Sequence, residues 1–143
     1  MGVPVNPYLC GSTSTSCCPS GYQDMLHVTL RKATCPDIDG KVADVRLIGI
    51  TPTAGGDRYT WQGPVANGQS LGTCGSLYVT VDIIPAAGCL WAVAVQNESG
   101  GLCLSAVATH VASCPLTNDA FSGIWDSVNC PCCSGSVTVH VSP

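Results

Sequence analysis

The chain has 143 residues, which fits one domain with a sizeable core. Charged residues make up 10% of it and the net charge is −4, so the surface offers no basic patch for nucleic-acid phosphates. No stretch approaches the roughly 18 consecutive apolar residues of a membrane span, and 16 Gly, 10 Pro and 11 Cys against two Met indicate β-sheet and turns rather than helix.

The first residues have no hydrophobic periodicity and are rich in Pro, Gly, Ser, Thr and Cys. We predict an irregular N-terminal arm at residues 1–24, tied down by disulfide, and a single domain at residues 25–143. Residues 1–9 have neither the basic region nor the apolar run of a signal peptide. Because abundant cysteines indicate an oxidising compartment, either the protein is made in the cytoplasm and released by lysis, or a signal peptide is removed before Met1.

From Met25 onward, apolar and polar residues alternate. Leu26, Val28 and Leu30 share one face, which is the pattern of a half-buried strand. Similar patterns separated by Gly-, Asn- and Asp-rich turns predict further strands at Val42–Ile50, Arg58–Gln62, Leu77–Ile84, Leu90–Gln96, Leu102–Val111, Phe121–Val128 and Val137–Val141.

Seven or eight short strands with no amphipathic helix between them predict an all-β fold, an antiparallel β-sandwich. The composition of Leu104–Ala112 also permits a helix, but we predict a strand there. Few surface charges leave strand edges poorly protected, which favours a surface partly covered in an assembly over a monomer with a Ser- and Thr-rich exterior.

The cysteines predict a disulfide-stapled domain. Adjacent cysteines rarely bond to each other, so each member of a doublet should reach a different partner. The count is odd, so one thiol is free, buried or bonded to another chain, and Cys10 in the arm is our candidate for an intermolecular bond. The ten disulfide candidates are Cys17, Cys18, Cys35, Cys74, Cys89, Cys103, Cys114, Cys130, Cys132 and Cys133.

Two motifs resemble metal sites without completing one. The segment Cys130-Pro131-Cys132-Cys133 has no second cysteine pair at zinc-finger spacing. The segment Asp37-Ile38-Asp39-Gly40 lacks the glutamate that ends a calcium loop, and we interpret it as a turn. We therefore predict no metal and no cofactor.

Four short motifs in order resemble a known group. They are Cys35 with Asp39-Gly40, then Trp61-Gln62-Gly63, then Cys74-Gly75, and finally Cys132-Cys133-Ser134-Gly135 leading into a strand. The pattern resembles a cysteine-rich β-domain of uncharacterised planctomycete and bacteriophage-associated proteins, and would cover about Cys17 to Val141. The resemblance implies a structural role on a virion or cell surface and carries no catalytic residues.

The sequence gives little support for catalysis. His27 and His140 alternate with apolar residues, which places them on the outer faces of strands, and no nucleophile motif accompanies them. Aromatic residues allow a different function, since Tyr59, Trp61 and Trp125 could form a platform on which sugars stack.

Together these features predict a non-enzymatic structural protein of a virus particle, such as a capsid cement, neck or tail-fibre component. Its expected partners are other virion proteins and itself, through exposed strand edges and the arm, with no nucleic acid and no membrane span. Its expected location is the virion, in an extracellular, oxidising setting. The alternative is a secreted or cell-surface module that binds carbohydrate.

Overall fold

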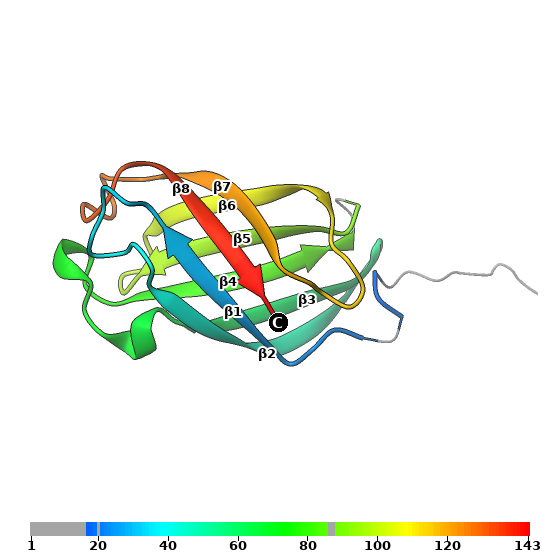
Figure 1. The fold of residues 1–143 in the computed structure, drawn as a ribbon. Helices are drawn as coiled ribbons and strands as arrows, with labels where there is room; N and C mark the ends of the chain where they lie inside the picture. The colour runs from blue at the N-terminus through cyan, green and yellow to red at the C-terminus, as the bar shows by residue number, and fades with distance from the viewer. Residues whose placement is uncertain (1–16, 20, 86–87) are drawn as a thin grey trace, which may run out of the picture.

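The computed structural model describes residues 17–19, 21–85 and 88–143. Its eight strands follow one another around a closed antiparallel barrel, each pairing with the next, and β1 pairs with β8 to close the circle (Figure 1). The strands are β1 (Met25–Arg31), β2 (Val42–Thr53), β3 (Gly56–Pro64), β4 (Leu77–Ile84), β5 (Leu90–Asn97), β6 (Leu102–Val111), β7 (Asp119–Trp125) and β8 (Gly135–Ser142).

The all-β antiparallel prediction is confirmed, and the predicted sandwich is corrected to a barrel. Alternation shows that each strand buries one face, which is equally true of both architectures. Closure depends on pairing between the first and last strands, whose register runs from His27↔Ser142 to Arg31↔Thr138. That contact leaves no local pattern in the sequence.

One strand lies earlier than predicted. We expected Phe121–Val128, whereas β7 ends at Trp125. The next residue, Asp126, accepts hydrogen bonds on Oδ1 from the backbone N–H groups of Val128 (2.9 Å) and Asn129 (3.2 Å). This side-chain-supported turn replaces strand pairing after Trp125.

The inward-facing side chains fill the barrel. Trp61 and Trp91 are 0% and 1% exposed and occupy its interior together with the Val, Leu and Ile side chains of the neighbouring strands. No charged or strongly polar residue is buried in the described ranges. The interior is therefore a packed apolar core.

The ladder is weakest between β6 and β7. Only Leu104↔Trp125 and Ser105↔Ile124 pair there, whereas β7 pairs with β8 along its whole length. The backbones of β6 and β7 approach each other closely at this seam, which requires a glycine at position 123. A Cβ on Gly123 would lie 2.5 Å from the carbonyl oxygen of Ser105. Outside this seam, closure of the barrel gives each strand a hydrogen-bonded neighbour on both sides. The prediction that strand edges are exposed is therefore wrong for most of the barrel.

Two short 3₁₀ turns, η1 (Ala66–Gly68) and η2 (Gly72–Cys74), interrupt the connection between β3 and β4. In the residues that the structure describes, no helix is long and apolar enough to cross a membrane.

Candidate functional site

Five disulfides pair all ten candidate cysteines, and they divide between the two ends of the barrel. Two lie at the end where the N-terminal arm meets the barrel, and three lie at the other end. The bonds are Cys17–Cys89, Cys18–Cys114, Cys35–Cys133, Cys74–Cys132 and Cys103–Cys130. The prediction that adjacent cysteines reach different partners is confirmed at both doublets.

At the end away from the arm, the segment Cys130–Cys133 forms what we call the C-terminal hub. Within four residues it bonds to Cys35 in the β1–β2 loop, to Cys74 in the β3–β4 loop and to Cys103 near the start of β6. One short loop thereby holds three other parts of the barrel rim.

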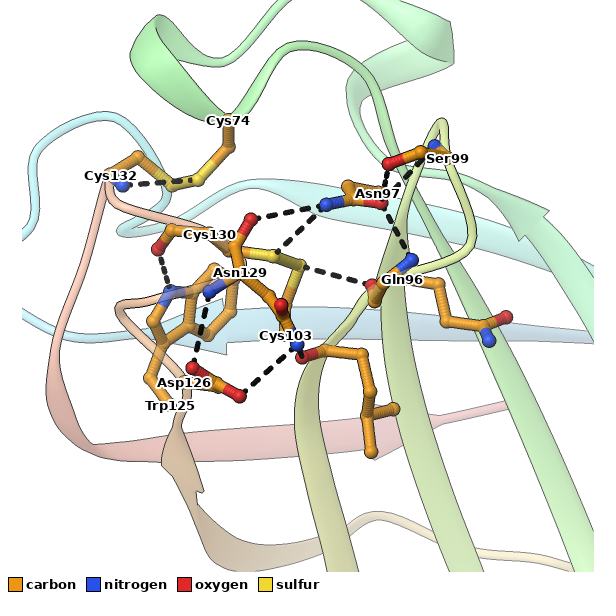
Figure 2. The surroundings of a disulfide bond; sticks show 12 residues. Cys74, Gln96, Asn97, Ser99, Cys103, Trp125, Asp126, Asn129, Cys130 and Cys132 are labelled. Carbon is orange, nitrogen blue, oxygen red and sulfur yellow. Dashed lines mark hydrogen bonds between the residues drawn. A yellow bond between two sulfur atoms is a disulfide. The ribbon is translucent and has the colours of Figure 1, made fainter.

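Hydrogen bonds connect the remaining loop to this hub (Figure 2). Asn97, at the end of β5, donates from Nδ2 to the carbonyl oxygen of Asn129 (3.1 Å), the residue just before the hub, and to the sulfur of Cys130 within it (3.8 Å). Its Oδ1 accepts from the backbone N–H groups of Ser99 (3.1 Å) and Gly101 (2.8 Å). The Trp125 indole N–H donates to the Cys130 carbonyl oxygen at 2.7 Å. All four loops at this end are therefore connected through the C-terminal hub.

The Asn97-Glu98-Ser99 triplet has the form of a glycosylation sequon, but its asparagine has a structural role. The nitrogen that would carry a glycan already donates to the Asn129 carbonyl oxygen and to the Cys130 sulfur of the hub. A sequence search for sequons does not reveal that role, and the following Ser99-Gly100-Gly101 turn is the only local signal for it.

At the opposite end, Cys17 and Cys18 form the arm hub. They bond to the β4–β5 loop and the β6–β7 loop respectively. Gln23 adds polar contacts: its side-chain Nε2 donates to the backbone carbonyl oxygen of Leu116 (3.0 Å), and its backbone carbonyl oxygen accepts from the Trp61 indole N–H (3.0 Å). The residues just before β1 therefore close this end of the barrel.

Three aromatic rings complete that closure. Tyr22 contacts Tyr59 edge to face at a centroid distance of 4.9 Å and Trp61 at 5.9 Å. The Tyr22 hydroxyl is buried and has no hydrogen-bond partner among the residues that the structure describes. Burial, with a smaller contribution from the phenol of Tyr59, raises the pKa of Tyr22 above its ordinary value.

The predicted glycan platform is wrong. Tyr59, Trp61 and Trp125 are 6%, 0% and 3% exposed, and all three point into the barrel. A stacking platform requires an exposed ring face. Period-two alternation places Tyr59 and Trp61 on one face but does not identify that face as the inner one.

The outer surface carries one arrangement reminiscent of nucleophilic catalysis. His27 Nδ1 lies 2.6 Å from Asp44 Oδ1, and Ser142 stands opposite His27 on β8. No hydrogen bond joins Ser142 to His27 in the described structure, and the His27 and Asp44 side chains are 41% and 55% exposed. Without a Ser–His contact or a desolvated oxyanion site, the pair is better explained as a cross-strand surface contact.

The residues described contain no group of three or more potential ligands that could hold a metal ion. In Cys130-Pro131-Cys132-Cys133, the segment that resembles part of a zinc site, every sulfur belongs to a disulfide, whereas zinc binds thiolates.

Cys10 lies outside the described residues. The five disulfides account for the other ten cysteines of the chain. No protein-family model, curated protein or solved structure matches the chain.

Proposed function

We propose that the protein is a non-enzymatic structural component of a virus particle, a capsid cement, neck or tail-fibre protein, that stabilises an assembly as a disulfide-locked barrel. The observation that carries the proposal is the pair of hubs. Five disulfides and a packed core exceed what a chain of this length needs to fold. Such bonds suit a protein that must persist outside the cell, where disulfides remain oxidised.

The mechanism is mass action. A protein that binds only the assembled state stabilises that state relative to its free parts. A rigid barrel suits this role because little conformational entropy remains to be lost when it docks. Cys10, the eleventh cysteine of the chain, would give a way to make the contact covalent.

The direct test is a density gradient of particles from the natural source, with the chain followed by antibody or mass spectrometry. We expect it to band with the particles in a fixed copy number and to remain after a salt wash. A chain found only as free protein in the surrounding medium contradicts the virion role and favours a secreted module.

A second experiment addresses stabilisation. Particles depleted of the chain should disassemble at a lower temperature, and the purified protein should restore the original temperature. The same material run on non-reducing gels tests Cys10: we expect a disulfide-linked species in the natural protein and none in Cys10→Ser.

A further inference from the structure

The two strands that close the barrel each carry a histidine on the outer surface. In β1 the residues on either side of His27 are buried, and in β8 the residues on either side of His140 are buried as well. Because successive side chains of a strand point to opposite faces, both imidazoles lie outside the barrel.

The pairing of β1 with β8 brings these two histidines together. Its register sets His27 opposite Ser142 and Thr29 opposite His140, so the histidines are diagonal neighbours on one face. Diagonal neighbours have Cα atoms about 7–8 Å apart, which is within reach of two aromatic side chains. On the other side of His140 stands Ala120 of β7, which adds only a methyl group to the surroundings.

A carboxylate on the opposite neighbouring strand orients the ring of His27. The strand β1 lies between β8 and β2 (Figure 1), and Asp44 of β2 accepts a hydrogen bond on Oδ1 from His27 Nδ1 at 2.6 Å. The two nitrogens of an imidazole lie on opposite sides of the ring, so Nε2 is turned away from β2, to the side on which β8 lies. With the proton on Nδ1, Nε2 keeps its lone pair, and it makes no hydrogen bond within the part of the chain that the structure describes.

We propose that His27 and His140 bind a late first-row divalent cation, such as Zn²⁺, on the outside of the β1–β8 junction, with Asp44 as the positioning residue of His27. Imidazole nitrogen is a preferred ligand of these ions, and a carboxylate on the other ring nitrogen commonly supports a metal-binding histidine. No set of three protein ligands occurs among the described residues, so water fills the remaining coordination positions. The inference goes beyond the proposed structural role and does not depend on it.

Two arginines near this site are directed away from it. Arg46 lies two positions along β2 from Asp44, on the side away from His140. Arg31 is the other diagonal neighbour of His140 on β1, but its guanidinium lies at the β1–β2 turn, where Nη1 is 3.4 Å from the position that a Cβ on Gly40 would take. The nearest charge on the His27 ring is therefore the carboxylate, which favours a cation.

The sequence does not reveal this site, because its two histidines lie near opposite ends of the chain. The prediction of no metal considered cysteine and aspartate motifs within short segments, whereas these ligands meet only when the barrel closes. A cation held by both strands adds a cross-link at the junction that closes the barrel.

The test measures Zn²⁺ binding by isothermal titration calorimetry at neutral pH, with untagged protein carrying Cys10→Ser so that Cys10 contributes no ligand. We expect one Zn²⁺ per chain in the parent, loss of binding in His27→Ala and in His140→Ala, and no Mg²⁺ binding, because Mg²⁺ prefers oxygen ligands. At a Zn²⁺ concentration of about 100 times Kd, the Tm of the parent should rise by about 9 °C. Without Zn²⁺ both variants should melt near the parent, which shows that they fold.

His110→Ala is the matched control, because His110 is the third histidine of the chain and belongs to β6, which pairs with neither β1 nor β8. We expect it to bind Zn²⁺ like the parent. A parent that does not bind Zn²⁺, undiminished binding without either histidine of the site, or an equal loss in His110→Ala overturns the inference.

Asp44→Asn tests the positioning role. An asparagine amide can donate to Nδ1, which moves the ring proton to Nε2 and removes the lone pair that binds the metal. We expect Zn²⁺ binding to weaken about tenfold or more in Asp44→Asn, with an unchanged Tm of the metal-free protein, and to recover in Asp44→Glu. An unchanged affinity in Asp44→Asn rejects the role of Asp44.

Discussion

Removing the Cys103–Cys130 bond tests whether the C-terminal hub holds the barrel rim. The two residues are 27 apart in the chain, and no other disulfide offers a shorter covalent route between them. Chain-entropy estimates for such a loop give about 3.5 kcal/mol at 25 °C. Both sulfur atoms are buried, so lost packing in Cys103→Ala/Cys130→Ala adds to this value. For a chain of this length the loss corresponds to about 12 °C in Tm.

The comparison variant is Cys17→Ala/Cys89→Ala at the arm hub. These residues are 72 apart, but a route through the neighbouring Cys18–Cys114 bond shortens the loop to about 26 residues. Its predicted entropic loss is therefore also about 3.5 kcal/mol, instead of the roughly 4.4 kcal/mol that the plain separation implies.

The assay is differential scanning calorimetry without reductant, in a Cys10→Ser background, after intact mass shows four remaining disulfides. We expect the hub variant to lose at least as much stability as the arm variant. A loss below about 1 kcal/mol in the hub variant would refute the view that the hub fixes this end. A clearly larger loss of stability in the arm variant would refute the assumption that the Cys18–Cys114 bond shortens the loop closed by Cys17–Cys89.

Three further substitutions test the packing. Tyr22→Phe should stabilise the protein by about 1 kcal/mol at neutral pH, because it removes a buried hydroxyl that has no hydrogen-bond partner in the described part of the chain. Because the pKa of Tyr22 is raised in the folded protein, the phenol ionises at a lower pH in the unfolded chain than in the folded one. The free energy of unfolding should therefore fall above about pH 10, and it should fall less in Tyr22→Phe than in the parent. An equal fall in the two proteins would contradict this. Gly123→Ala should cost about 2 kcal/mol through its clash with the Ser105 carbonyl oxygen. Gly49→Ala is its control, since nothing lies within 4 Å of a Cβ there, and equal losses would exclude the close-approach explanation. Asn97→Ala should cost about 2 kcal/mol because it removes both the acceptor and the donor that anchor the β5–β6 loop, and an unchanged denaturant midpoint would show that the hub does not need it.

The strands and the cysteine doublets could be predicted because their signals are local. Alternation gave β4 and β6 with their exact bounds, Leu77–Ile84 and Leu102–Val111. Steric rules for adjacent cysteines predicted that each doublet would diverge, without identifying the partners.

The rest depends on contacts between distant segments. The inward orientation of Tyr59 and Trp61 is set by which face meets the other strands, and closure is set by a ladder between the first and last strands. The anchoring contacts of Gln23 and Asn97 join residues 93 and 32 positions apart. No pattern within a short window carries that information.

The disulfides lie beside the two junctions that the strand ladder makes most vulnerable. The pairing of β1 with β8 joins opposite ends of the domain, so its loop-closure entropy cost is the largest of all the strand pairs. The Cys35–Cys133 bond, whose cysteines are 98 residues apart in the chain, lies next to this pairing. The β6–β7 seam has only two paired positions. Cys103–Cys130 spans one end of it, and Cys18–Cys114 ties the β6–β7 loop at the other. Bonds placed where opening would begin oppose partial unfolding, which is the property that the proposed structural role calls for.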